Sequence, residues 1–424
     1  MKIAGIVAEY NPFHNGHLYH LERTKELCSA DYVICVMSGN FIQRGEPAIV
    51  NKWARTKMAL LSGVDLVLEL PVVYAMASAE FFAWGAVKIL DSIGIVDDIC
   101  FGSECGEVAQ LDSIAEILAF EPDLYKGLLK EKMGMGMSFP SAREEALKQY
   151  CIRTMNASDT ASIEEIIGSP NNILGIEYIK ALKKLNSKIK PVTLKRICNS
   201  YNSEQLTGVI SSATSIRKYI YEIMDRKNGC TDVENHESLP ATSFNILAGE
   251  FQNQRGPVFS DSFGDLILSI IRRMTPEELK EIPYVSEGLE NRIKDAANNS
   301  GSFDELLDKI TTKRYTSTRI KRCLFSILAG IKKSDFDLFN AHGGPQYIRV
   351  LGFNENGKQI LSLAKDTSQL PIIVKAANFK NSGNPLVRRM LEIESASTDM
   401  YVLGYRNPEF KKAGQEFTQN VVRV

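Results

Sequence analysis

The stretch Ile3-Ala-Gly-Ile-Val-Ala-Glu-Tyr-Asn-Pro-Phe-His-Asn-Gly-His17 decides the fold of this chain. Its first six residues, Ile3–Ala8, form an apolar run that predicts a buried strand, and Leu18–Ala30 has the apolar spacing of a helix. Two histidines three residues apart, His14 and His17, therefore lie where a strand passes into a helix. In a doubly wound sheet this junction is the ligand crevice, and the N-terminus of the helix favours phosphate.

Nucleotide chemistry suits this junction. Three of the five histidines of the chain, His14, His17 and His20, fall within it, and Gly16 allows the backbone to approach a phosphate closely. His14 and His17 can donate hydrogen bonds to phosphoryl oxygens during a transfer that depends on positioning and charge stabilisation. The plain alternative is a turn that carries solvated histidines. The strand before it and the helix after it favour a phosphate site.

Beyond this junction, strand and helix patterns alternate through the first half of the chain. Strands are predicted at Ile3–Ala8, Tyr32–Met37, Asp65–Leu70, Asp98–Phe101 and Pro191–Lys195. Helices are predicted at Leu18–Ala30, Asn51–Ser62, Ala75–Leu90, Glu107–Lys132, Ser141–Arg153 and Asn171–Leu185. Such alternation indicates an α/β fold with a Rossmann-like, doubly wound parallel sheet and helices on both faces.

Three parts are expected along the 424 residues. A polar stretch at Asp225–Pro240 ends a nucleotide-binding domain, which we assign to residues 1–230. Helical apolar spacing then predicts a helical domain over residues 240–340, with helices at Phe263–Met274, Leu289–Ala297, Phe303–Ile310 and Ser317–Ile331. A strand, helix, strand, helix pattern follows, and it predicts a small α/β C-terminal domain over residues 341–424.

The composition is that of an ordinary globular protein, with 44% apolar and 24% charged residues. A net charge near −1 excludes a globally basic nucleic-acid binder, so any RNA site must be a local patch. The eight cysteines are scattered and include no Cys-x-x-Cys pair, which indicates a reduced cytoplasmic protein without a structural metal. No uninterrupted apolar stretch of about 18 residues occurs, so no membrane span is expected.

The pattern His14-Asn-Gly-His17 resembles the His-x-Gly-His signature of the nucleotidyltransferase superfamily. A second signature of that group is a serine-rich turn that opens a late helix, and Ile210-Ser-Ser-Ala-Thr-Ser-Ile-Arg217 resembles it, with Ala213 where many relatives carry serine. The resemblance implies contacts to the β- and γ-phosphates from Ser211, Ser212, Thr214 and Arg217. A helix N-cap would explain one of these hydroxyl groups, but not three together with an arginine.

Five longer blocks narrow the resemblance: Ala8–His17, Met37–Pro47, Phe101–Glu104, Ser169–Gly175 and Lys313–Arg319. Together they resemble the bacterial tRNA(Met) cytidine acetate ligase family, over nearly the whole chain. The resemblance implies that ATP and acetate form acetyl-adenylate, which then acetylates N4 of the wobble cytidine, position 34, of elongator tRNA(Met). Magnesium is expected with the ATP phosphates, although the sequence indicates no particular carboxylate ligand and no oligomeric state.

The ATP site is expected at the carboxyl ends of the strands. The family pattern implies nucleotide contacts along one continuous run: Val7, Ala8, Glu9, Tyr10, Asn11, Pro12, Phe13, His14, Asn15, Gly16, His17, Leu18, Tyr19 and His20. Gly102 follows a strand, Asn171 opens a helix, and Arg196 ends a strand where a cation can meet phosphate; all three are predicted to join the site. The plain alternatives are a turn glycine, a helix cap and a surface Lys-Arg pair.

A basic run between Lys309 and Arg322 contains no acidic residue and lies outside the nucleotide-binding domain. Basic side chains contact phosphate, and an aromatic side chain can stack on an unpaired base. The residues assigned to RNA binding are Lys313, Arg314, Tyr315, Arg319, Lys321 and Arg322. The plain alternative is a solvated charged face. A second group of residues could face acetate or RNA, and the equally plausible alternative is a solvated, charged helix end. These residues are Gln43, Arg44, Lys52, Trp53 and Arg55.

Catalysis is assigned to His14, His17 and Arg217, which would stabilise charge on the phosphates. An amine conjugated into a pyrimidine is a weak nucleophile, so the reaction requires an activated acyl donor. Two alternatives remain: a small-molecule adenylyltransferase of the pantetheine-phosphate or nicotinamide-nucleotide type, and a non-catalytic RNA-binding protein that retains the fold. The first would not need the second half of the chain with its basic run. The intact histidines and Arg217 count against the second.

Overall fold

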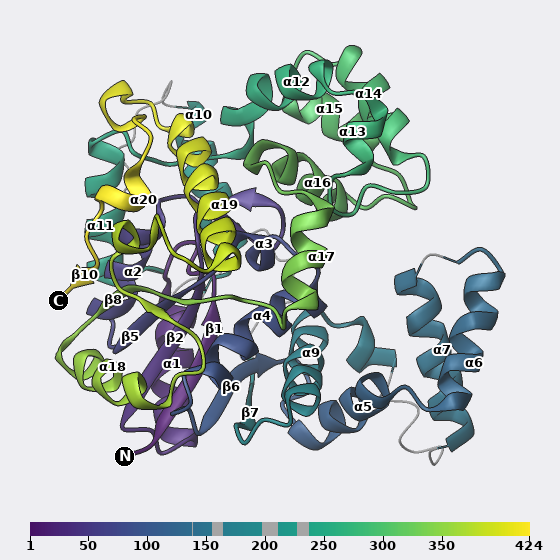
Figure 1. Ribbon diagram of the computed structural model, residues 1–424, viewed down its shortest axis with the longest axis horizontal. Helices are drawn as coiled ribbons and strands as arrows, with labels where there is room; N and C mark the ends of the chain where they lie inside the picture. Colours follow the sequence, from purple (N-terminus) through teal and green to yellow (C-terminus); the bar gives the residue numbers. More distant parts are fainter. Residues whose placement is uncertain (138, 155–163, 197–210, 227–236) are drawn as a thin grey trace.

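A computed structural model of the protein describes residues 1–137, 139–154, 164–196, 211–226 and 237–424. Its centre is a mostly parallel sheet in the order β10-β8-β5-β2-β1-β6-β7 (Figure 1). The predicted strands form its parallel part: β1 (Ile3–Ala8), β2 (Tyr32–Ser38), β5 (Leu66–Leu70), β6 (Asp98–Ser103) and β7 (Lys190–Lys195). The predicted α/β fold is therefore confirmed.

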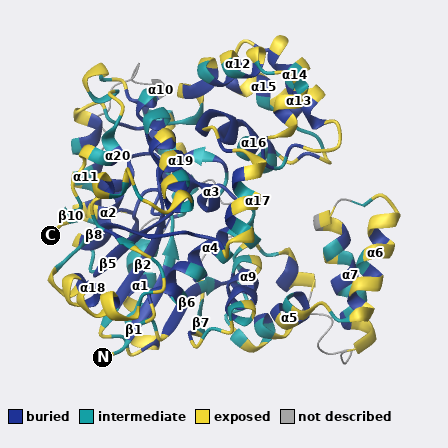
Figure 2. Ribbon diagram, in the orientation of Figure 1, coloured by how far each residue is buried: buried dark blue, intermediate teal, exposed yellow. Residues whose placement is uncertain are grey.

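Both faces of this sheet are covered by helices. Helices that pack against it include α1 (Asn15–Leu27), α2 (Lys52–Leu61), α4 (Ala79–Ser92) and α9 (Pro170–Leu185). Successive side chains of a strand point to opposite faces, so on β2 Cys35 packs in the core of α1 and α2 while Val36 packs in that of α4 and α9. Figure 2 shows the buried residues concentrated in the sheet and the helices around it.

Two predicted helices, Ala75–Leu90 and Glu107–Lys132, are each divided in the structure. The second break occurs because Glu121 has a left-handed φ of 45° and Pro122 cannot continue a helix. Apolar spacing continues across such a break, which is why the pattern alone does not locate it. The helices of this region besides α4 are α3 (Val72–Ala75), α5 (Val108–Phe120), α6 (Asp123–Gly134) and α7 (Phe139–Thr154).

The helical middle of the chain follows the predicted spacing. Its helices are α12 (Gly264–Arg273), α13 (Pro276–Lys280), α14 (Leu289–Asn298), α15 (Phe303–Ile310), α16 (Ser317–Ala329) and α17 (Lys333–Ala341). In Figure 1, α12 to α15 form a separate group, and α16 and α17 lead back toward the sheet. In contrast, α11 (Ala241–Gln252) packs against α2, and its Leu247 and Phe251 join the core on that face of the sheet.

The C-terminal part shares the central sheet instead of forming a sheet of its own. β8 (Ile348–Phe353) lies antiparallel to β5, and β10 (Val422–Arg423) lies parallel to β8. The prediction of a separate small α/β C-terminal domain is therefore corrected. Without β8, β5 would expose an unpaired edge, so this pairing completes the sheet. The other elements of this part are α18 (Glu355–Thr367), β9 (Ile372–Ile373), α19 (Pro385–Tyr401) and α20 (Gln415–Thr418).

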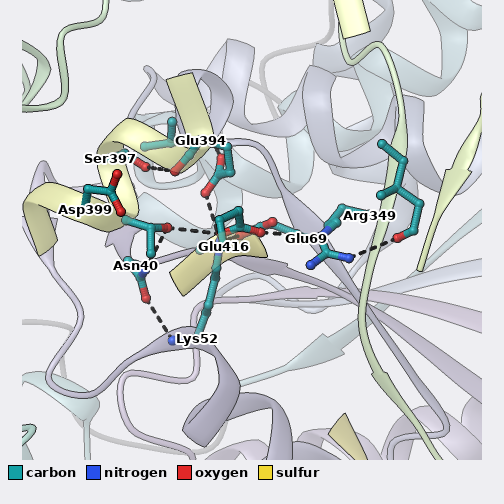
Figure 3. Close-up of polar contacts among 12 residues, drawn as sticks. Asn40, Lys52, Glu69, Arg349, Glu394, Ser397, Asp399 and Glu416 are labelled. Carbon is teal, nitrogen blue, oxygen red and sulfur yellow. Dashed lines mark hydrogen bonds and ion pairs between the residues drawn. The ribbon is translucent and has the colours of Figure 1, made fainter. Parts of the chain in front are cut away.

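A buried ionic cluster fastens this C-terminal part to α2 and β5 (Figure 3). Lys52 Nζ lies 2.5 Å from a carboxylate oxygen of Glu69 and 2.5 Å from one of Glu416. It also lies 3.3 Å from Glu394 Oε1, and Arg349 Nε lies 3.4 Å from Glu416 Oε1. Their side chains are at most 2% exposed, so Lys52 does not face acetate or RNA. The Lys52 cluster comprises Lys52, Glu69, Arg349, Glu394 and Glu416.

Candidate active site

The two predicted histidines meet at the N-terminus of α1, directly after β1. His14 is the N-cap residue, and its Nδ1 accepts a hydrogen bond from the backbone N–H of Gly16 at 3.0 Å. In return, His17 Nδ1 accepts a hydrogen bond from the backbone N–H of His14 at 3.3 Å. The two ring centroids are 3.8 Å apart. This reciprocal capping fixes both rings at the end of the helix where phosphate is favoured.

The same histidines are neutral donors. Burial, followed by the nearby charges of Arg196 and Arg217, lowers the pKa of His14 to about 3. Burial and then the neighbouring His14 hold the pKa of His17 well below its usual value. A neutral imidazole whose Nδ1 accepts a hydrogen bond carries its proton on Nε2. Each ring therefore has an Nε2–H donor of the kind that a phosphoryl oxygen requires.

Side chains in the middle of the loop are buried, and two of them pack against the ring of His17. The rings of Tyr10 and Phe13 are buried, and their centroids lie 4.9 and 5.7 Å from that of His17. Asn11 Oδ1 accepts a hydrogen bond from Ile49 N at 2.7 Å. Tyr10, Asn11 and Phe13 are at most 2% exposed, and their contacts with ATP stay a prediction. Tyr10 has a left-handed φ of 47°, a strained conformation that is common at functional sites.

The second signature reaches the first through Arg217. This residue lies on α10 (Ala213–Arg226), and its Nη1 donates to the carbonyl oxygen of Asn11 at 2.8 Å. Its Nη2 lies 3.5 Å from Thr214 Oγ1. The guanidinium is therefore held against the histidine loop, although some 200 residues separate the two in sequence.

The two serines of the turn have structural partners. Ser212 Oγ accepts a hydrogen bond from Ser215 N at 3.0 Å, so it caps α10. Ser238 Oγ donates to Ser211 Oγ at 2.9 Å, and the carbonyl oxygen of Ser238 accepts from Asn15 N at 3.0 Å. The N-cap explanation therefore accounts for Ser212, and the turn lies beside the N-terminus of α1. Ile210, the first residue of the signature, is outside the described residues.

Gly102, Asn171 and Arg196 are brought together beside the histidine loop. Arg196 Nη1 donates to Asn171 Oδ1 at 3.3 Å, and a Cβ atom at Gly102 would lie 3.2 Å from Arg196 Cγ. Glu104, to which we assigned no role, accepts from Asn171 Nδ2 at 2.7 Å and from Asn172 N at 2.8 Å. The sequence features that could have indicated this contact are an acidic residue directly after a strand and two consecutive asparagines at the start of a helix.

Arg55 is buried and holds the loops of the site together, instead of facing acetate or RNA. Its Nη1 donates to the carbonyl oxygens of Glu9 at 2.6 Å and Ser38 at 3.1 Å, and its Nη2 donates to that of Gly39. Its Nε donates to the carbonyl oxygen of Val50 at 3.1 Å. The planar guanidinium thereby joins the segments that follow β1 and β2 to the one that precedes α2.

The basic run divides into buried and exposed members. Tyr315 is 8% exposed and its hydroxyl donates to the carbonyl oxygen of Glu287 at 2.9 Å, so the prediction that it stacks on a base is wrong. Lys321 and Arg322 are directed toward the sheet domain, where both have protein partners. Both residues are partly exposed, and their assignment to RNA binding stays a prediction.

Three further members remain at the surface to different degrees. Arg319 Nη2 donates to the carbonyl oxygen of Tyr284 at 2.9 Å and lies 3.0 Å from Ser286 Oγ. Lys313 is exposed, and Arg314 forms a 2.7 Å ion pair with Glu287 in which both side chains are more than half exposed. Lys313 and Arg314 are therefore the predicted RNA contacts that a large ligand could reach most easily.

In the ranges that the structure describes, no three His, Cys, Asp or Glu side chains gather in a way that could hold a metal ion. No helix within those ranges combines the length and apolar character needed to cross a membrane. The cysteines found free there are Cys28, Cys35, Cys100, Cys105, Cys151 and Cys323. Cys198 and Cys230 lie outside the described residues.

Comparison with known proteins places these features in one family. The family model named HIGH Nucleotidyl Transferase matches residues 1–416. The chain is 56% identical to a tRNA(Met) cytidine acetate ligase of Acetivibrio thermocellus, and the match covers 100% of both chains. It is 46% identical to a protein of the same name from Thermoanaerobacter sp. (strain X514), again over 100% of both chains.

Solved structures agree with these relatives. The fold is similar to that of Thermotoga maritima TmcAL bound with alpha-thio ATP, with a TM-score of 0.90, 39% identity and 100% of both chains covered. The apo form of the same T. maritima protein has a TM-score of 0.92 and 38% identity, also over 100% of both chains.

Proposed function

Because this chain belongs to the tRNA(Met) cytidine acetate ligase family of HIGH nucleotidyltransferases, we propose that it uses ATP to join acetate to a tRNA cytidine. Its product is N4-acetylcytidine at the wobble position, 34, of elongator tRNA(Met). The observation that carries this proposal is the meeting of His14, His17 and Arg217 at one helix N-terminus, in a chain that matches its relatives from end to end.

In the first half-reaction an acetate oxygen attacks the α-phosphorus of ATP. The bond from this phosphorus to the bridging oxygen breaks, pyrophosphate leaves and acetyl-adenylate forms. Negative charge grows on the phosphate oxygens during this step. The Nε2–H groups of His14 and His17, together with the Arg217 guanidinium, stabilise that charge. The neutral rings act by hydrogen bonding alone, so no proton needs to be transferred from them.

In the second half-reaction the cytidine N4 attacks the acetyl carbonyl carbon. The bond between that carbon and the phosphate oxygen breaks, AMP leaves and N4 loses one proton. Activation as an adenylate is required because the N4 lone pair is conjugated into the pyrimidine and attacks weakly. The total reaction converts ATP, acetate and cytidine to N4-acetylcytidine, AMP and pyrophosphate.

ATP is proposed to lie along the loop from Val7 to His20, with Gly102, Asn171 and Arg196 on its other side. A Cβ atom at Gly102 would lie 3.2 Å from Arg196 Cγ, so this cation lies beside the carboxyl end of β6, where a phosphate could meet it. ATP would enter with its magnesium ion, as phosphoryl-transfer enzymes generally require. Since the described residues include no cluster of three metal-ligating side chains, phosphate oxygens and water would supply most of the ion's ligands.

The tRNA is proposed to reach the exposed end of the basic run, at Lys313 and Arg314. Phosphate contacts from such residues position a nucleic acid without reading its sequence. Recognition of this tRNA and of its wobble cytidine must therefore involve further contacts near the nucleotide loop.

Pyrophosphate exchange into ATP tests the proposal. With the protein, ATP, magnesium and labelled pyrophosphate but no tRNA, label should enter ATP only when acetate is present. Transfer of labelled acetate should then require tRNA(Met), and a transcript with uridine at position 34 serves as the matched control because it lacks the amine. Exchange that requires phosphopantetheine or nicotinamide mononucleotide in place of acetate would favour a small-molecule adenylyltransferase. No exchange with any of these acceptors would favour a non-catalytic RNA-binding protein.

A further inference from the structure

A short hairpin lies between the nucleotide-binding loop and α16. It consists of β3 (Phe41–Ile42) and β4 (Glu46–Pro47), which pair antiparallel. Gln43 lies in the turn of this hairpin, and its backbone N–H and its backbone carbonyl oxygen both form hydrogen bonds to other segments. Its N–H donates to Glu9 Oε1 at 2.9 Å, and its carbonyl oxygen accepts from Arg322 Nε at 2.8 Å. One residue thus connects the loop that carries the histidines to the helical part of the chain.

The position of this turn is set by α16. Gly45 has a φ of 71°, and a Cβ atom there would lie 2.4 Å from the backbone nitrogen of Arg322, so the two backbones touch. Lys321 Nζ forms a 2.5 Å ion pair with Glu46 Oε1, and these side chains are only 23% and 21% exposed. A largely buried ion pair and a close backbone contact leave the turn little freedom to shift relative to α16.

Glu9 connects this turn to the catalytic charges. Burial raises the pKa of Glu9, while the Gln43 N–H and the charge of Arg217 act in the opposite direction, which indicates that the carboxylate lies within electrostatic reach of Arg217. Burial lowers the pKa of the Arg322 guanidinium, while the nearby charges, that of Glu9 among them, act in the opposite direction, so Arg322 too lies within electrostatic reach of Glu9. A shift of the turn would therefore move a negative charge relative to the cation that stabilises the phosphates.

We propose that Lys321 and Arg322 are positioning residues for adenylate formation: they hold the hairpin turn so that Gln43 fixes the Glu9 carboxylate beside the nucleotide-binding loop. Although both belong to the basic run, they act on the reaction of ATP with acetate and make no contact with tRNA. The inference rests on the proposed function, because it assigns the two cations to the first half-reaction.

Replacement of Arg322 by glutamine tests this in the exchange reaction without tRNA. A small misplacement of groups around a reacting centre can cost up to ~10²-fold in rate, so Arg322→Gln should lower kcat for acetate-dependent exchange by about 10-fold or more. Its tRNA affinity should stay within about 2-fold of wild type, because one lost phosphate contact would cost more than that at low salt. The matched control is Lys309→Gln, which removes an exposed cation that pairs with Glu305 at 2.6 Å.

A charge swap separates positioning from simple damage to the fold. Lys321→Glu and Glu46→Lys should each lower exchange, and the double variant should recover most of it because the ion pair re-forms with opposite polarity. If Lys321 instead contacts RNA, the single variants should not change exchange. The double variant should then bind tRNA as weakly as Lys321→Glu does. Thermal unfolding of each variant shows whether the rate is lost per folded molecule.

The outcomes distinguish this inference from the proposed function. A wild-type protein without acetate-dependent exchange would overturn the proposed function itself. Wild-type exchange that Arg322→Gln leaves intact, or a swap that restores nothing, would overturn the positioning role and leave the proposed function standing.

Discussion

Two buried polar regions of this molecule use hydrogen bonding in opposite ways. In the Lys52 cluster an ammonium group is surrounded by three carboxyl groups from distant parts of the chain, and it forms an ion pair with each of them. In the nucleotide-binding loop, the rings of His14 and His17 are neutral, and the partners that they have among the described residues are bonded to their Nδ1 atoms. The difference teaches that burial of polar groups does not by itself mark a site. A closed network holds the fold, whereas donors left open can meet a substrate.

Helix α2 serves both regions from its first turn. Lys52 and Arg55 are three residues apart and fully buried. Lys52 has carboxylate partners and joins the C-terminal part to the sheet. Arg55 has carbonyl partners and shapes the segment after β1. Two like charges on one helix therefore have different tasks, which their partners decide.

The largest effect is expected on stability, when the cation of the Lys52 cluster is removed. Lys52→Met removes the cation and leaves buried carboxylates without their partner. Breaking a buried ion pair in this way costs about 3–5 kcal/mol, so we expect a loss of that size in the free energy of unfolding, measured with urea. Lys57→Met is the matched control, because Lys57 lies on the same helix but is exposed. A loss below about 1 kcal/mol in Lys52→Met would contradict the structural role of the cluster.

Removing a donor from the open region should affect rate instead of stability. Asparagine is a good N-cap residue, so His14→Asn retains the cap of α1 but lacks the Nε2–H group. Loss of one preorganised donor lowers a rate by about 10²–10³-fold, and we expect acetate-dependent exchange to fall by that factor. The unfolding free energy should change by less than about 1 kcal/mol. Unchanged exchange in His14→Asn would remove His14 from the mechanism.

The contrast between closed and open partners also divides the basic run. Arg322 is directed inward, whereas Arg314 is 60% exposed. Arg314→Gln should weaken tRNA binding by a few fold and reduce the slope of log affinity against log salt by about 0.7–0.9, because one fewer counterion is released. Binding of tRNA(Met) at two salt concentrations measures both quantities. An unchanged slope would mean that Arg314 contacts solvent and Glu287 only.

Much of the open region could be predicted because its signals are local. An apolar run, two histidines and a helical pattern are consecutive, so spacing alone placed His14 and His17 at the end of β1. The approach of Arg217 to this loop was inferred from a resemblance to known signatures, since nothing in the spacing connects residues that far apart. The hydrogen bond from Arg217 to Asn11 agrees with that inference.

The closed region could not be predicted, because its contacts join distant segments. No local pattern shows that β8 pairs with β5, or that Glu394 and Glu416 meet Lys52. The same limit explains the error at Tyr315, whose neighbours in sequence are basic but whose hydroxyl is bonded to Glu287. A run of charges reports what a segment carries and leaves open which side chains face inward.

The smallest expected effect is the absence of a titration. Histidine in a folded protein usually titrates near pH 6.5, but burial lowers the pKa of His14 to about 3 and that of His17 well below 6.5. Protonation would add a hydrogen to Nδ1, which now accepts a hydrogen bond from a backbone N–H. The two N–H groups would then face each other, so protonation of the folded site is unfavourable. The unfolded chain does take up these protons, and stability from the neutral rings is therefore lost as pH falls below about 6.5.

In the free protein, the histidine NMR signals that disappear in His14→Asn and His17→Asn should not shift between about pH 8 and pH 5. A midpoint near 6.5 for either signal would mean that the rings are open to water, and the distinction between the two buried regions would then fail.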